Sequence, residues 1–596
     1  MNTIKNLVKR DKSERKGKNM KKLLALLLAL ILTVTMLTPA ASAVSNTTSP
    51  IVMLRGDGVA LSMRDENGKE TEIWPLGFGD FDGKIGETAK NILIPFLTEG
   101  LLFDKWDNYY KVCYEELSPI MKDVVLDNNG EPLNNSGIVN DYVNSNKSIY
   151  KRAAYGATDY TFYYDWRLSP YSVPTEAKGT EKRIVDLLHD YIKEVSRVNG
   201  GKKVTLAGNC LGGSYVLAYL KEYGDEGLLR NVFFNSTVGN TTAILTDVFC
   251  GDIKVDAKGL QRFADEYIDA DADNLAGILD TAPAINSLIT TTLDLCVQLG
   301  ILDMLGKTID DVYQKVYEVL VPMLVIAFYG TMPGYWTIIE PERLDEAINF
   351  VFGPEGSEYR TEYAGVIKKI EDYFDEVGNC KYDIIEACQQ SGIRFGATAK
   401  YGVQMYPFVE SQNKLSDEMA DLYHASFGAT VADSVYDVLP TSHIDAAIAA
   451  GKGKYISPDK QIDASTSLFK DTIWFEKNMP HNAWEYDYKV IEAFAANDNF
   501  TVDSDPNLPQ FAIRIPGTGT IDPDTGREDP ETSRVEKMTA ENCNISNWND
   551  TSEDTKTNEP TVATKLMAFF RWLTAMIKFI LHITNDNPGS LEDAIN

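Results

Sequence analysis

Short hydrophobic runs and helix-spaced hydrophobic residues alternate along this chain. The residues between 176 and 198 carry apolar side chains three or four positions apart, which predicts an amphipathic helix. A second helix is predicted from about 485 to 495. Other segments have strand length and carry mostly apolar, β-branched or aromatic residues; they cover 51–54, 160–164, 204–208, 228–235, 392–399 and 472–475. Strands that alternate with helices form parallel sheets, so the pattern predicts an α/β fold.

A long helical segment interrupts this alternation. From 240 to 390 the hydrophobic spacing indicates one helix after another, with no strand between them. A helical insertion after a core strand is typical of a cap over an active site. We therefore predict a core formed by 44–239 and 391–522, with a large helical cap insertion at 240–390.

The first 43 residues have the pattern of an export signal. A long basic start precedes an apolar run from Leu23 to Leu37, and Ala41-Ser42-Ala43 offers a small-residue cleavage site. The apolar run is short for a membrane span, although an uncleaved anchor is the competing interpretation. The sequence thus predicts a secreted or cell-surface protein, with 1–43 as signal peptide.

The other end of the chain predicts two further segments. Residues 523–562 are acidic, polar and poor in aromatics, which favours a flexible linker. Residues 563–596 are predicted to be an amphipathic helix and tail, because the polar residues of 566–583 recur at helical spacing and leave a broad apolar face. That face suits peripheral contact with a membrane and equally suits docking on protein.

Composition narrows the function classes. The 596 residues carry a net charge of −30, which argues against nucleic acid as a partner. Seven cysteines would allow three disulfides and one free thiol, with Cys380 and Cys388 as one candidate pair. Neither a C-x-x-C motif nor a His/Cys cluster is present, so no metal and no cofactor are predicted.

The candidate chemistry centres on Gly208-x-Cys210-x-Gly212, which lies between a predicted strand and a predicted helix. This is the pattern of a nucleophile elbow, with cysteine in place of the usual serine. The turn exposes the reactive side chain, and the amide of Leu211 is placed to stabilise an oxyanion. The alternative interpretation is a small buried cysteine beside glycines that end a strand.

Two later residues complete a candidate triad. Asp463 lies in a loop before the run at 472–475, and His481 follows that run, which gives the chain order nucleophile, acid, histidine. In such a triad the histidine takes the thiol proton and the aspartate orients the imidazole. His443 and Asp459 remain as alternatives for the two positions. His189 falls among charged positions of the helix at 176–198 and is predicted to be solvated.

A longer motif supports this interpretation. The chain resembles the lecithin:cholesterol acyltransferase family over roughly 50–235 and 390–495, through the glycine-flanked Cys210, the late Asp463 and His481, and the run Tyr164-Asp165-Trp166-Arg167-Leu168-Ser169-Pro170. The resemblance implies an α/β-hydrolase fold with cap insertions and acyl transfer from a lipid ester to an alcohol or water. It also implies oxyanion amides at Leu211 and Asp57. The family differs in carrying serine at 210, usually histidine at 209, and an apolar residue at 57.

These observations leave a ranked set of functions. The first is an exported acyltransferase or acyl-ester hydrolase that acts on a lipid or other acyl ester through an acyl-cysteine intermediate. The alternative is a non-catalytic cell-surface binding protein that keeps the fold. A cysteine peptidase shares the Cys–His pair but has a different chain layout. The Gly-x-Cys-x-Gly-Gly run is also similar to the box of polyhydroxyalkanoate synthases, which act on thioesters inside cells.

Overall fold

The computed structural model describes residues 48–75, 105–149, 159–252, 321–405, 409–515 and 534–544, together with 91 and 95. The export signal, residues 253–320 of the expected cap, and the C-terminal helix lie outside the described residues. None of the helices described has the length and apolar character needed to cross a membrane.

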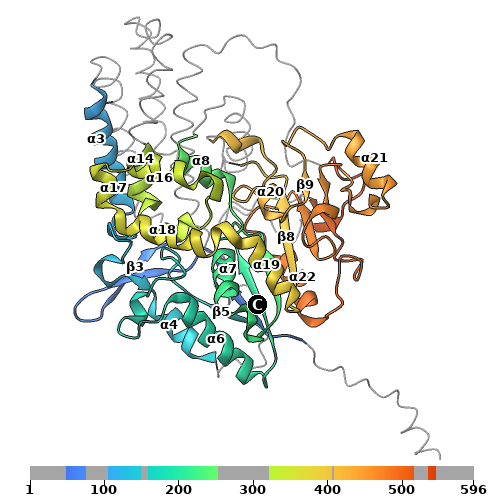
Figure 1. Cartoon of the computed structure of the whole chain (residues 1–596), viewed down its shortest axis with the longest axis horizontal. Coiled ribbons are helices and arrows are strands. Elements are labelled where there is room, and N and C mark those ends of the chain that lie inside the picture. Colours follow the sequence, from blue (N-terminus) through green and yellow to red (C-terminus); the bar gives the residue numbers. More distant parts are fainter. Residues whose placement is uncertain are drawn as a thin grey trace, which may run out of the picture. The chain divides into compact units, whose positions relative to one another are not determined.

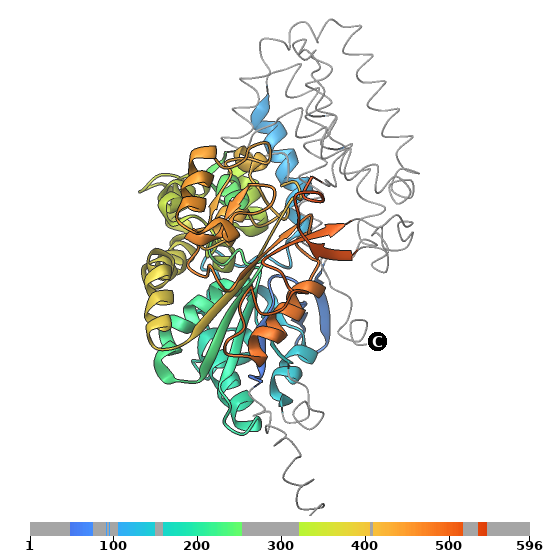
Figure 2. The same cartoon turned by 90° about the vertical axis from the view of Figure 1, so that its right-hand side faces the viewer.

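A mostly parallel sheet of eight described strands forms the centre of the molecule (Figures 1 and 2). Neighbouring strands in this sheet are parallel, except that β13 at one edge runs antiparallel to β12. The strand order is β13 (Arg534–Lys537), β12 (Phe511–Ile515), β11 (Ile473–Lys477), β8 (Arg394–Tyr401), β7 (Leu229–Asn235), β6 (Val204–Asn209), β1 (Ile51–Leu54) and β5 (Asp159–Phe162). The predicted α/β class is confirmed.

Helices cover both faces of this sheet, because alternate side chains of each strand point to opposite sides. On one face, strand residues such as Leu206 and Phe234 share a core with α6 (Ile184–Val198) and α7 (Gly212–Tyr223). On the other face, residues such as Phe233 and Trp474 pack with α22 (Glu485–Ala496). Because the central strands are buried on both sides, their sequences are rich in apolar residues on both faces.

The described parts of 240–390 are helical. In Figure 1, α18 and α19 are drawn in yellow, and α19 packs against α7 of the core. α16 packs against α8 and α14, so this segment forms its own layer beside the sheet. The helices are α8 (Ala243–Cys250), α14 (Val321–Val325), α15 (Pro333–Trp336), α16 (Leu344–Phe352), α17 (Glu358–Glu362), α18 (Ala364–Glu376) and α19 (Lys381–Gln390).

Smaller elements surround the core. A three-stranded sheet joins β3 (Glu70–Trp74), β2 (Leu61–Arg64) and β4 (Gly137–Ile138), and a two-stranded one joins β9 (Thr430–Val431) and β10 (Ile462–Asp463). The remaining α-helices of the described ranges are α3 (Trp106–Leu117), α4 (Asn140–Lys147), α20 (Leu422–Ala425) and α21 (Thr441–Ala449).

Three predictions outside the candidate site differ from the structure. β13 lies inside the expected linker 523–562; its four residues are all exposed and show no apolar run, so only pairing with β12 makes them a strand. His189 is buried and stacks on Tyr223, with ring centroids 3.9 Å apart, because α6 packs closely on α7. The six cysteines in the described ranges, Cys380 and Cys388 among them, are free, which excludes the suggested bridge between those two.

Candidate functional site

Cys210 occupies a strained turn between β6 and α7. Its φ is +49°, in the left-handed region that residues with a side chain rarely adopt, and the residue as a whole is half-buried, although its thiol group lies in the interior. The flanking glycines are required by packing: a β-carbon at Gly208 would stand 2.9 Å from Gly213, and one at Gly212 would stand 2.6 Å from the carbonyl oxygen of Leu54. The predicted strand, sharp turn and helix are therefore present.

The loop after β1 lies directly against this cysteine. A β-carbon at Gly56 would stand 2.9 Å from Cys210 Cβ and 3.1 Å from Sγ, closer than real contacts allow. The backbone N–H of Leu211 interacts with the Cys210 sulfur and lowers the pKa of the thiol, as a donor aimed at a developing anion would. The role of this amide as an oxyanion donor stays a prediction.

His481 follows β11 and is held by Asp417. Its Nδ1 lies 2.8 Å from Asp417 Oδ2, and its backbone N–H donates to the Asp417 carbonyl oxygen at 3.0 Å. The Asp417 carboxylate is itself fixed, since Oδ1 accepts from the amides of Met419 and Ala420. Both ring and carboxylate are buried, at 4% and 0% exposure, so the pair is preorganised.

The other ring nitrogen of His481 faces the thiol. Nε2 is buried and makes no hydrogen bond among the described residues. The imidazole ring and the Cys210 thiol nevertheless interact electrostatically. Burial alone would lower the pKa of His481, but Asp417 and then Cys210 outweigh it and raise that pKa well above its ordinary value. Burial raises the pKa of the Cys210 thiol, and the imidazole charge opposes that rise.

The predicted acid Asp463 is not the partner of His481. Asp463 Oδ2 lies 2.9 Å from Nε2 of His443, so the two residues considered for separate roles bind each other. The alternative acid, Asp459, accepts from Tyr401 at 2.7 Å and from Lys477 at 3.0 Å. Asp417 takes the expected place and keeps the chain order nucleophile, acid, histidine.

Asp417 is not among the residues predicted from the sequence, because it lies in the irregular excursion after β8, where no hydrophobic period marks a position. The signal that could have found it is local: an aspartate followed by residues whose amides it caps, just downstream of a core strand. Asp463 shows the same signal, since its Oδ1 accepts from the amide of Ser465. Only the path of the loop in three dimensions decides that Asp417, and not Asp463, lies beside His481.

Asp57, the second predicted oxyanion residue, follows Gly56 next to the thiol. Its carboxylate accepts a 2.5 Å hydrogen bond from the Tyr335 hydroxyl, and its carbonyl oxygen accepts from the Trp74 indole at 2.7 Å. These contacts fix the loop after β1 beside Cys210. The role of the Asp57 amide stays a prediction.

The Asp-Trp-Arg motif forms a buried support under this loop. Asp165 and Arg167 are fully buried, and two hydrogen bonds of 2.9 and 2.6 Å join their side chains. The Trp166 indole donates to the carbonyl of Val59 at 3.0 Å, and the Tyr164 hydroxyl binds the carbonyl of Arg55. The motif therefore holds both ends of the loop that carries Gly56 and Asp57.

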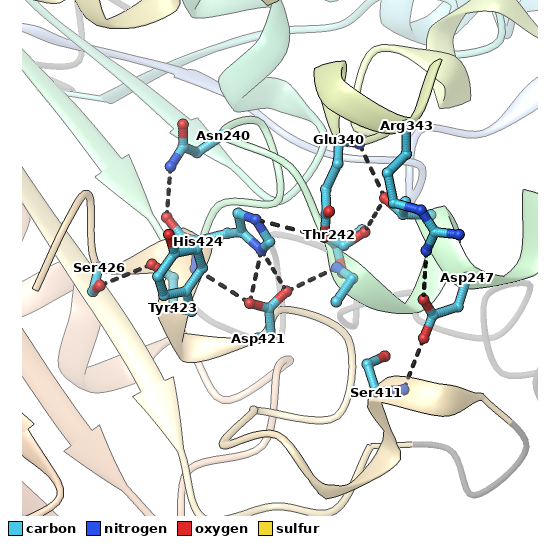
Figure 3. Close-up of polar contacts among 12 residues, drawn as sticks. Asn240, Thr242, Asp247, Glu340, Arg343, Ser411, Asp421, Tyr423, His424 and Ser426 are labelled. Atoms are coloured by element: carbon cyan, nitrogen blue, oxygen red, sulfur yellow. Dashed lines mark hydrogen bonds and ion pairs between the residues drawn. The ribbon is translucent and has the colours of Figure 1, made fainter. Parts of the chain in front are cut away.

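A further histidine–aspartate pair has a different environment (Figure 3). His424 Nδ1 lies 2.8 Å from Asp421 Oδ2, and its Nε2 lies 3.6 Å from Glu340. Asp421 also accepts from the Ala243 amide at 2.8 Å. With carboxylates on both ring nitrogens, His424 links the helical segment after β7 to the excursion after β8.

The fold and the site together define an α/β protein with a cysteine, a histidine and an aspartate gathered at the carboxyl end of a parallel sheet. That edge is where open α/β sheets bind ligands. In the described part of the chain, no group of histidine, cysteine and carboxylate side chains could hold a metal ion. No family model, curated protein or solved structure matches the chain.

Proposed function

We propose that this protein is an exported acyltransferase or acyl-ester hydrolase that works through a Cys210–His481–Asp417 triad on an α/β-hydrolase fold. The observation that carries the proposal is the strained, glycine-flanked turn that holds Cys210 beside an imidazole whose far nitrogen is bound by a buried carboxylate. The resemblance to the lecithin:cholesterol acyltransferase family supports a lipid-like ester as substrate. The export-signal pattern at 1–43 supports action outside the cytoplasm.

The chemistry follows from these positions. The sulfur of Cys210 attacks the ester carbonyl carbon while His481 Nε2 takes the thiol proton, and the oxyanion forms near the Leu211 amide. Collapse of this intermediate breaks the C–O bond, and His481 passes the proton to the departing alcohol. A second alcohol or a water then attacks the thioester with His481 as base, and the acyl group leaves on it as the thiol re-forms.

Asp417 makes this exchange of protons favourable. Its carboxylate accepts a hydrogen bond from Nδ1–H, which keeps the proton on Nδ1 and leaves the Nε2 lone pair available to the thiol. It also stabilises the imidazolium that forms when the thiol ionises, which is why the pKa of His481 is raised. A buried thiol without such a partner would resist ionisation, because burial raises the pKa of Cys210.

The test compares the full-length protein with Cys210→Ala and His481→Ala on short p-nitrophenyl acyl esters and on phospholipid vesicles. Both variants are expected to lose activity almost completely. Cys380→Ala serves as a matched control, because that partly exposed thiol lies at the start of α19 and contacts the Glu376 carbonyl. Equal background rates in all four proteins would reject the enzyme and favour a non-catalytic binding protein.

Trapping the intermediate gives a second readout. Mass spectrometry after a brief incubation with ester should show one acyl group bound as a thioester at residue 210 and none in Cys210→Ala. Added alcohol that shortens the lifetime of this thioester and yields a new ester would identify a transferase. Release of free acid alone would identify a hydrolase.

A further inference from the structure

Three ionisable side chains meet in the interior behind His481. Lys400 on β8 and Glu476 on β11 are paired in register, and Asp487 comes from the first turn of α22. Their exposures are 1%, 0% and 0%. Buried charges are costly unless they are paired, so this cluster needs a specific arrangement.

The Lys400 ammonium group binds the segment that carries His481. Nζ donates to the carbonyl oxygen of His481 at 3.2 Å and to that of Ala483 at 2.6 Å, and it lies 2.7 Å from Asp487 Oδ2. It also lies 4.2 Å above the Trp484 ring. All four contacts fall between 481 and 487, so one buried cation ties this connection to β8.

The charges balance only if one carboxyl keeps its proton. One ammonium faces two carboxyls, and neither oxygen of Glu476 has a hydrogen-bond donor among the described residues. Burial, followed by the charge of Asp487, raises the pKa of Glu476 well above its ordinary value. A neutral Glu476 would donate to the Asp487 carboxylate and satisfy oxygens that otherwise have no partner.

We propose that Lys400 is a positioning residue for His481 and that Glu476 and Asp487 share one proton, which leaves a neutral cluster of one cation and one anion. Lys400 acts through the backbone of His481 and Ala483 and fixes where the imidazole stands relative to Cys210. The effect on turnover rests on the proposed function. The effect on Cys210 reactivity does not.

The contacts of Lys400 with Asp487 and with the carbonyl oxygens of His481 and Ala483 are called the clamp below. The first test removes this clamp without leaving a buried charge. The double variant Lys400→Met with Asp487→Asn is compared with Lys454→Met with Asp503→Asn, which removes an exposed ion pair elsewhere. Misplacement by about 1 Å costs about 100-fold in rate, so kcat for ester should fall by about 100-fold with little change in KM. The control pair should match the wild type.

The second readout is independent of turnover. Alkylation of Cys210 by iodoacetamide, followed by mass spectrometry against pH, should shift to higher pH in the clamp variant, because a displaced imidazole no longer favours the thiolate. A folded clamp variant with the wild-type profile and the wild-type kcat would overturn the positioning role. If Cys210→Ala keeps full ester activity, the proposed function is wrong. The pH profile of Cys210 alkylation would still show whether Lys400 positions His481.

The shared proton is tested by infrared spectroscopy at about pH 8, where an ordinary carboxyl is ionised. Wild-type protein should show a neutral carboxyl band that is missing in Glu476→Gln, a variant that mimics the neutral acid and should keep kcat and the alkylation profile. The band should also vanish in Asp487→Asn, since Glu476 must then ionise to balance Lys400. A wild-type spectrum identical to that of Glu476→Gln would overturn the shared proton, and neither measurement requires the clamp variant to fold.

Discussion

His481 binds Asp417 twice, through its backbone N–H to the Asp417 carbonyl oxygen at 3.0 Å and through Nδ1 to Asp417 Oδ2 at 2.8 Å. Two contacts fix both the position of the residue and the plane of its ring. The remaining nitrogen can then point only toward the turn that carries Cys210. This relationship distinguishes Asp417 from the other aspartates of the excursion.

Replacement of Asp417 by asparagine should abolish most activity. The amide would place an N–H₂ donor against Nδ1, which forces the ring proton onto Nε2 and removes the base. Loss of the equivalent carboxylate in a serine triad costs about 10,000-fold in kcat, so we expect a loss of roughly 1,000-fold or more in ester turnover.

The matched control is Asp463→Asn, which breaks the contact with half-exposed His443 and should change turnover by less than about threefold, as for surface pairs. Steady-state kinetics of both variants on one ester decides whether Asp417 or Asp463 is the acid of the triad. If Asp463→Asn is the inactive variant and Asp417→Asn is not, the assigned acid is incorrect.

His481→Gln should make Cys210 less reactive at neutral pH. Burial raises the pKa of the thiol, and the positive imidazole is what opposes that rise. Without the imidazole, the thiolate forms only at higher pH, so the midpoint of the alkylation profile of residue 210 should move upward. A midpoint that stays in place or moves downward would show that the two side chains are not coupled.

A methyl group at Gly56 should damage the site more than the fold. Its β-carbon would stand 3.1 Å from Cys210 Sγ, and overpacking of this kind costs about 1–3 kcal/mol. Gly56→Ala should therefore lower kcat strongly and the unfolding temperature by a few degrees. Gly453→Ala is the control, because its nearest neighbour is a side-chain carbon of Ile448 at 3.3 Å. Equal activity of the two variants would argue against close contact at residue 56.

Asp421 should stabilise the protein in a pH-dependent way. Burial alone would raise its pKa, but His424, Lys414 and the Ala243 amide lower it from 3.8 to about 2. A carboxyl whose pKa is lowered in the folded state stabilises the fold at pH values above its unfolded pKa, near 4. This contribution to the free energy of unfolding disappears as the pH falls toward 2.

Asp421→Asn should then lose about 2 kcal/mol at pH 7 and roughly half of that near pH 3, as measured by urea unfolding. Asp372→Asn provides the control, since that exposed residue pairs with exposed Lys368 and its loss should cost less than about 0.5 kcal/mol. An Asp421→Asn penalty that is the same at both pH values would reject this electrostatic account.

Much of the core could be predicted because its signals are local. The apolar runs at 51–54 and 204–208 became β1 and β6, since a strand buried on both faces needs apolar side chains in succession. The glycines at 208 and 212 marked the turn before the structure showed which backbone atoms they approach. His481 could be found because it follows directly after a strand.

The exposed edge of the sheet and the acid could not be predicted in the same way. β13 is a strand only because β12 lies beside it, and that pairing connects segments with no shared sequence pattern. Asp417 and Asp463 are both loop aspartates that cap nearby amides, so nothing in their neighbouring residues separates them.

The sequence by itself determined the parallel core, the turn at Cys210 and the position of His481 after β11, because hydrophobic period and glycine sterics act over a few residues. Only the tertiary structure decided that Asp417 binds the imidazole and that Lys400 is buried beneath the same segment. Those contacts depend on where an irregular loop and a helix return to the sheet, which is set by packing between residues up to 87 positions apart, from Lys400 to Asp487.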